Sequence, residues 1–190
     1  MLPNPREEEK LDPRVKRTRG LILQSFESLL AEKGFETISV QDVTDKAQVN
    51  RATFYAHFPD KYALLDYSIQ KAFMSEIEKR TLNVCSYSPD NLRNLILAVV
   101  EFLSRVHTGC AQPHQQFESL IEGTIKKQIF DLLSYWLRKS NVPIEIPATV
   151  ASWAIYGLAS HYSHMKKRPA LEKFVDEAYP LVAVNLEQFA

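Results

Sequence analysis

The feature that most constrains this chain is the stretch from residue 39 to residue 61, SVQDVTDKAQVNRATFYAHFPDK, which has the spacing of two short helices joined by a tight turn. Ser39 can cap the first helix, because its hydroxyl can accept a hydrogen bond from the backbone N–H of Asp42. The Asp42 carboxylate can accept one in return from the backbone N–H of Ser39, a shorter version of the capping box. An apolar face follows at helical spacing, formed by Val40, Val43 and Ala47.

The second half of this stretch has its own start signal and its own apolar face. Gln48 and Val49 carry the turn, and Asn50 is placed to cap the next helix. Phe54 and Phe58 are four residues apart and give that helix a buried face. Its free face carries side chains that can hydrogen-bond to nucleic acid, namely Arg51, Thr53, Tyr55 and His57. Together these features predict a helix-turn-helix.

Residues 47–61, AQVNRATFYAHFPDK, followed by Leu64 and Leu65, resemble the TetR family of bacterial transcriptional repressors. The core T-hydrophobe-Y-x-H-F-x-x-K at residues 53–61 is far more specific than a general helix-turn-helix pattern. The resemblance covers residues 12–65 by motif, and beyond them it rests on length and helix pattern. The family usually has glycine where this chain has Gln48. Glycine suits a turn position with positive φ, so we expect Gln48 to cost roughly 1 kcal/mol there.

The DNA contacts are assigned to this motif residue by residue. Arg51 opens the second helix, and its planar guanidinium suits the O6 and N7 atoms of guanine. Thr53 can meet a thymine methyl group or a phosphate, and the resemblance implies phosphate contacts for Tyr55 and His57. The alternatives are a half-buried aromatic at Tyr55 and a solvent-facing histidine at His57. The full predicted set of DNA-binding residues is Ser39, Asn50, Arg51, Ala52, Thr53, Tyr55, His57 and Lys61.

A capped helix is predicted before the motif. Asp12 can cap it, Pro13 suits its first position, and Gly34 suits its end. Its first two turns hold four basic residues, Arg14, Lys16, Arg17 and Arg19, which form either a solvated face or contacts to phosphates. Basic and acidic residues are balanced through residue 61, so placement matters more than total charge. Residues 1–11 are polar, contain two prolines, and are predicted to be disordered.

Composition supports an all-α fold and sets limits on function. The chain has 190 residues with 45% apolar content and five glycines, and it lacks strand-like alternation. The formal net charge is zero, so any DNA-binding charge must be local. The two cysteines, Cys85 and Cys110, fit reduced thiols in a cytoplasmic protein, and no apolar run is long enough to span a membrane. No phosphate-binding glycine loop, nucleophile elbow or paired-carboxylate motif is present, so we do not expect an enzyme.

The sequence predicts a helix-turn-helix domain at residues 12–59 and a helical regulatory and dimerisation domain at residues 60–190. In the second domain we expect one long helix from Asp60, a second from Pro89 to Gly109, and a third ending near Lys139. Two more are expected, one from Pro147 to Arg168 and one from Ala170 to Phe189, kinked at Pro180. These last two form the predicted dimer interface through Trp153, Tyr156, Gly157, Ser160, Ala178, Leu181 and Val182.

Two further kinds of site are considered for the second domain. Its aromatic and apolar residues could line a ligand cavity or simply fill the core, and the candidates are Phe73, Phe102, Phe117, Ile121, Tyr135, Trp153 and Tyr156. His107, Cys110 and His114 lie close in the sequence, and His161 and His164 are three residues apart. Nothing in the sequence brings these two groups together. We therefore expect no metal site and no cofactor.

The sequence thus predicts a dimeric DNA-binding transcriptional regulator, a repressor that binds a palindromic operator in double-stranded DNA and responds to a small-molecule effector. The alternative is a non-switching DNA-binding protein, or a protein that docks a partner, on the same scaffold. A helical metal-dependent enzyme is a third class, but it would need clustered ligands that the sequence does not show.

Overall fold

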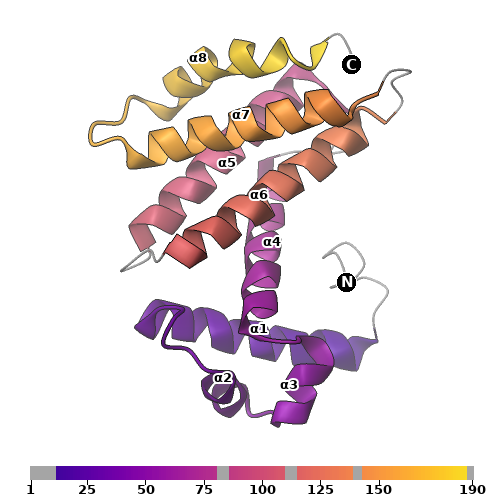
Figure 1. The fold of residues 1–190 in the computed structure, drawn as a ribbon, viewed down its shortest axis with the longest axis vertical. Helices are drawn as coiled ribbons and strands as arrows, with labels where there is room; N and C mark the ends of the chain where they lie inside the picture. Colours follow the sequence, from indigo (N-terminus) through magenta and orange to yellow (C-terminus); the bar gives the residue numbers. More distant parts are fainter. Residues whose placement is uncertain (1–11, 81–85, 110–114, 139–142, 188–190) are drawn as a thin grey trace. The chain divides into compact units, whose positions relative to one another are not determined.

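The computed structural model describes residues 12–80, 86–109, 115–138 and 143–187, and in these ranges the chain is helical with no strand, which confirms the all-α prediction (Figure 1). The predicted disordered arm at residues 1–11 lies outside the described residues. The helices in chain order are α1 (Pro13–Lys33), α2 (Val40–Ala47), α3 (Arg51–His57), α4 (Lys61–Arg80), α5 (Pro89–Gly109), α6 (Gln115–Trp136), α7 (Glu145–His164) and α8 (Leu171–Ala183).

The chain forms two compact units. The first contains Met1–Lys71 and Gly109–Leu120, and the second contains Ala72–Thr108 and Ile121–Ala190. The division therefore falls within α4, so that one uninterrupted helix carries residues of both units.

The first unit is built on α1, whose ends are those the sequence predicts. The Asp12 carboxylate accepts a hydrogen bond of 2.7 Å from the backbone N–H of Arg14, and Pro13 is the first helical residue. Gly34 ends the helix with a φ of 74°. Packing joins α1 to α2 and α2 to α3. The shared core of this unit includes fully buried side chains from α1 to α4 and from the segments between them, namely Ile22, Phe26, Ile38, Val43, Phe54, Phe58 and Leu64.

The second unit has an apolar core, a buried carboxylate at Glu76, and ion pairs between its helices. Core side chains include Phe73, Leu95, Val99, Leu103, Ile125, Leu133, Ile155 and Val175. Glu76 on α4 is buried and accepts a hydrogen bond of 2.5 Å from Arg105 on α5. Burial raises the pKa of Glu76, but the hydrogen bond from Arg105 and the nearby cations outweigh it and leave the pKa below its usual value. Arg93 on α5 pairs with Asp176 on α8, and α7 packs against α8.

The helix ends in the second unit differ from the prediction by a few residues. α6 ends at Trp136 instead of near Lys139, and α7 begins at Glu145 instead of Pro147. Pro147 is tolerated because it lies in the first turn, where backbone N–H groups have no partner within the helix. α7 ends at His164, so the cations that follow it lie outside the helix. Arg168 nevertheless caps the end of α7, since its guanidinium donates a hydrogen bond of 2.5 Å to the Ser163 carbonyl.

No helix in the described ranges combines the length and the apolarity that crossing a membrane would require.

Candidate nucleic-acid interface

The capping box predicted for α2 is present in both directions. The Ser39 hydroxyl accepts a hydrogen bond of 3.1 Å from the backbone N–H of Asp42, and the backbone N–H of Ser39 donates to the Asp42 carboxylate at 2.7 Å. Lys33 forms an ion pair with the same carboxylate at 2.9 Å. The bonds from Ser39, and then the one from Lys33, hold the pKa of Asp42 well below its usual range. The start of α2 is therefore fixed by charged as well as neutral hydrogen bonds.

The turn between α2 and α3 uses a left-handed residue. Gln48 has a φ of 54° and a ψ of 42°, and among the described residues no other non-glycine has a positive φ. Its backbone N–H donates to the carbonyls of Thr44 and Asp45, and the N–H of Val49 donates to the Thr44 carbonyl at 3.0 Å. The positive φ inferred from the family's usual glycine is thus confirmed.

Two buried rings hold α3 in place. The Asn50 side chain caps this helix by accepting a hydrogen bond of 2.7 Å from the backbone N–H of Thr53. Phe54 and Phe58 are both fully buried, with ring centroids 6.0 Å apart, and Phe58 packs 5.4 Å from Tyr67 of α4. The predicted apolar face of α3 is therefore confirmed, and its orientation is set by this aromatic contact.

The opposite face of α3 is exposed. It carries Arg51, Ala52 and Tyr55, with Thr53 and His57 half-buried beside it. The Arg51 guanidinium donates a hydrogen bond of 3.3 Å to the Tyr55 hydroxyl, which holds the two side chains next to each other on the surface. Ala56 is exposed four residues after Ala52. Ala56 is not among the predicted contact residues, although its i, i+4 spacing from Ala52 places it on the same face.

His57 lies at the edge of this exposed face. Partial burial, and then the charge of Arg19, lower the pKa of His57 below its usual value. The imidazole is therefore mainly neutral near pH 7, and one of its ring nitrogens can donate a hydrogen bond. The backbone carbonyl of His57 accepts a hydrogen bond of 3.4 Å from the Arg19 guanidinium.

Two predicted phosphate-binding cations are turned inward. Arg19 is 5% exposed, and its guanidinium lies 5.3 Å from the Phe58 ring centroid and 5.2 Å from that of Tyr67. The Lys61 ammonium donates hydrogen bonds to three carbonyls, those of Phe35, Glu36 and Ile38, at 3.0–3.3 Å. Both cations therefore act within the protein, whereas Arg14, Lys16 and Arg17 of the predicted basic cluster are exposed on α1.

The remaining predicted site residues belong to the second unit, apart from Phe117, whose side chain lies outside the described residues, as do Cys85, Cys110 and His114. Phe73 and Phe102 are buried and pack edge to face at 5.4 Å, and Ile121 is also buried. Trp153 is exposed, as is Tyr135. The structure therefore does not bring the whole predicted ligand-binding set together in the core.

The predicted dimer residues divide in the same way. Trp153, Gly157 and Leu181 are exposed, with Tyr156 and Ser160 half-buried beside them, whereas Ala178 and Val182 lie in the core of the second unit. The latter two cannot form part of an exposed surface in this fold.

The geometry of residues 39–61 defines a helix-turn-helix domain, a class that implies DNA binding. Residues 22–67 match the family described as "Bacterial regulatory proteins, tetR family". Over these residues the chain has the DNA-binding domain of TetR-family transcriptional regulators.

Curated relatives of this chain include HTH-type transcriptional regulators. The chain is 40% identical over 83 residues to the uncharacterised HTH-type transcriptional regulator YxbF of Bacillus subtilis, a match that covers 43% of this chain and 22% of YxbF. It is 22% identical over 187 residues to the biofilm operon icaADBC negative transcriptional regulator IcaR of Staphylococcus aureus, covering 88% of this chain and 98% of IcaR. The chain thus spans only about a quarter of the length of the first two curated relatives that it matches.

Solved structures share the fold over most of the chain. A TetR-family regulator from Streptomyces coelicolor has a TM-score of 0.64 at 15% identity, covering 93% of this chain and 98% of that one. RolR, solved in complex with resorcinol, has a TM-score of 0.54 at 16% identity, covering 92% and 93%.

Proposed function

We propose that the protein is a transcriptional repressor that reads operator DNA through α3. The observation that carries this proposal is the exposed face of Arg51, Ala52 and Tyr55 on a helix fixed by its cap and by two buried rings. Arg51 lies in the first turn of α3, the part of a recognition helix that reaches base edges, and it is assigned to guanine. Ala52 and Ala56 are small enough to let the helix backbone approach the bases.

Phosphate contacts complete the proposed interface. We assign them to Thr53, Tyr55 and His57, with contributions from the exposed cations at the start of α1. Ser39 and Asn50 use their side chains as helix caps, so their role is to position the two helices of the motif. Lys61 is assigned a positioning role as well, because its ammonium already binds three carbonyls.

A selection of genomic fragments with the purified protein tests the DNA-binding proposal, since it should return a palindromic site. Arg51→Ala should then weaken binding to that site by about 1–3 kcal/mol and relax the preference at one base pair. Arg138→Ala is the matched control, since Arg138 is an exposed arginine two residues after α6. If no palindromic site is recovered, or if both variants lose affinity equally, the assignment of α3 is wrong.

We further propose that the protein binds this operator as a homodimer. One recognition helix reads few base pairs, and two heads related by a two-fold axis can read half-sites one helical turn apart. The second unit offers a surface for this pairing. Ile146, Val150, Trp153 and Gly157 form one exposed stripe along α7 at spacings of four and three residues, and Leu181 and Val184 are exposed on α8.

Single substitutions on the exposed surfaces of α7 and α8 test the dimer. Trp153→Glu and Leu181→Glu should each convert the dimer to monomer in sedimentation experiments, because a buried unpaired carboxylate is costly. Tyr135→Glu is the control, since Tyr135 is an exposed aromatic residue on α6. A wild-type protein that is monomeric at tens of micromolar would refute the pairing.

A small-molecule effector completes the proposal. RolR shares the fold and was solved with resorcinol, which supports screening apolar and aromatic compounds. In the second unit, Phe73, Phe102 and Ile121 are the buried residues of the predicted ligand set, with Tyr156 half-buried. A ligand that displaced the α4 segment at Phe73 would also move residues of the first unit, because α4 is continuous. Operator release measured across a compound library tests this. A response to none of the compounds would favour the non-switching alternative.

A further inference from the structure

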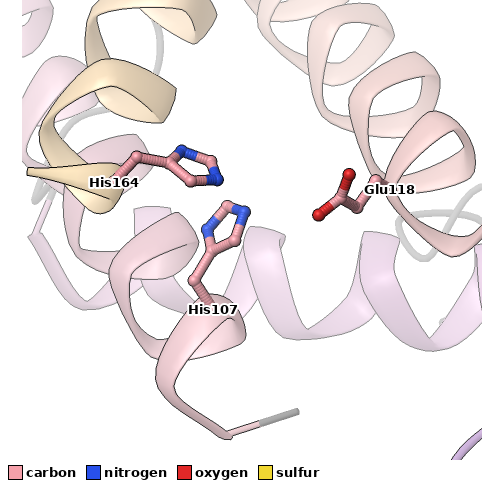
Figure 2. Close-up of side chains that lie close together, drawn as sticks. All are labelled: His107, Glu118 and His164. Atoms are coloured by element: carbon pink, nitrogen blue, oxygen red, sulfur yellow. The ribbon is translucent and has the colours of Figure 1, made fainter. Parts of the chain in front are cut away.

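Two histidines that are distant in the sequence meet in the second unit. His107 lies near the end of α5, and His164 is the last residue of α7. Their ring centroids are 4.3 Å apart with an interplanar angle of 63° (Figure 2). Nothing in the sequence brings the group containing His107 to the group containing His164, so the structure corrects the expectation that the two groups stay apart.

Hydrogen bonds fix the tautomer that each ring adopts in its neutral form. The Nδ1 atom of His107 lies 2.8 Å from the Leu103 carbonyl, and that of His164 lies 2.8 Å from the Ser160 carbonyl. A carbonyl oxygen only accepts, so Nδ1 is the donor in each ring and Nε2 keeps its lone pair. The Ser163 hydroxyl, 3.3 Å from the same Nδ1 of His164, donates its own proton to the Ser160 carbonyl at 2.7 Å.

This arrangement is typical of metal-binding histidines, in which the second ring nitrogen is anchored on a carbonyl or carboxylate. A ligand atom of His107 lies within 4.8 Å of a ligand atom of His164. Two imidazole nitrogens bound to one zinc ion at about 2.0–2.1 Å stand roughly 3.4 Å apart in tetrahedral geometry. This separation falls within the 4.8 Å limit. His107 is half-buried and His164 is exposed, so an ion can reach both.

We propose that His107 and His164 bind a single divalent transition-metal ion, such as Zn²⁺, Ni²⁺ or Cu²⁺, through their Nε2 atoms and thereby join α5 to α7. Water molecules fill the remaining coordination positions. Imidazole favours these ions over Mg²⁺ and Ca²⁺, which prefer oxygen ligands. Glu118, also drawn in Figure 2, belongs to the first unit, and the proposed site does not include it.

Titration of the full chain, purified without a histidine tag, with ZnCl₂ or NiCl₂ in a calorimeter tests the site. We expect saturable binding of one ion, no response to MgCl₂, and at least about a 10-fold loss of affinity in His107→Asn and in His164→Asn. His161→Asn is the matched control, because His161 is an exposed histidine on the same helix as His164. Its affinity should equal that of the wild type.

A second measurement covers variants that fold poorly. In protein labelled with ¹⁵N-histidine, Zn²⁺ should shift the Nε2 resonances of His107 and His164 and leave those of His57 and His161 in place. The proposal is overturned if no ion binds saturably, if His161→Asn reduces the affinity as much as His107→Asn, or if the shifted resonances belong to other histidines. None of these outcomes depends on whether the protein binds DNA.

Discussion

The left-handed turn residue Gln48 gives the sharpest test of the structure, through the pair of variants Gln48→Gly and Gln48→Ala. Gln48 has a φ of 54° at the end of α2, and its side chain is exposed. Removing the side chain therefore sacrifices no buried packing. Both variants lose the same polar group, so the difference between them reports the effect of one Cβ atom at this backbone conformation.

The magnitude follows from two opposing effects. A residue with a Cβ atom in the left-handed region costs about 1–2 kcal/mol relative to a right-handed conformation, and glycine avoids this cost. Glycine also gives the unfolded chain more freedom, which offsets the gain by about 0.4–1 kcal/mol. We therefore expect Gln48→Gly to be more stable than Gln48→Ala by about 0.5–1 kcal/mol. For chains of 150–250 residues, 1 kcal/mol corresponds to about 2–4 °C in the melting temperature.

Urea unfolding followed by circular dichroism, together with thermal melts, measures the difference. Gln48→Asn should fall between the two variants, because asparagine tolerates the left-handed region better than alanine does. If Gln48→Ala is as stable as Gln48→Gly or more so, residue 48 does not adopt a positive φ in solution, and the described turn between α2 and α3 is wrong.

Three further predictions concern the same unit. Lys61→Met should lower the free energy of unfolding by about 1–3 kcal/mol, because three carbonyls lose a charged donor. The control Lys71→Met, at an exposed position of the same helix, should change it by less than about 0.5 kcal/mol. Equal effects of the two substitutions would contradict the role of Lys61. Asn50→Ala should lower the free energy of unfolding by about 1 kcal/mol through loss of the α3 cap, whereas Asn50→Asp should retain most of the stability. Equal losses of stability in the two variants, measured by urea unfolding, would rule out capping by Asn50. The pKa of His57 is lowered in the folded state, so the imidazole of the unfolded chain becomes protonated at a higher pH than that of the folded chain. The contribution of neutral His57 to the free energy of unfolding is therefore fully present above about pH 6.5 and is lost as pH falls through the folded pKa. His57→Gln should therefore lose less stability than the wild type between pH 7.5 and pH 5.5, and identical pH profiles would show that His57 is not perturbed.

Local signals in the sequence were enough to predict the helix-turn-helix. Caps at Asp12, Ser39 and Asn50 act through bonds to residues two or three positions away, so short-range pattern determines them. The apolar spacing of Phe54 and Phe58 fixed which face of α3 is buried, and therefore which face is available to DNA. The family's glycine at position 48 identified the turn conformation.

Long-range contacts decided what the basic residues do. In the sequence pattern Arg19 and Lys61 look like exposed cations. In the structure, however, Arg19 packs against Phe58 and Tyr67, and Lys61 binds carbonyls more than twenty residues away in the chain. The sequence pattern could not distinguish these inward cations from Arg14 or Arg17, because the choice depends on which backbone groups and rings the fold brings within reach.

In the second unit, too, the sequence pattern could not predict which side chains are buried by packing between helices. Helix periodicity predicted its apolar helices, but it assigned Ala178 and Val182 to the dimer surface, whereas packing buries them. His107 and His164 are far apart in the chain and meet because α5 and α7 end near each other. The sequence by itself therefore determined the helices, their caps and the class of DNA-binding motif, since these depend on neighbours within a few residues. Only the tertiary structure decided which charged, small and metal-binding side chains are free to act, because that depends on contacts between helices distant in the chain.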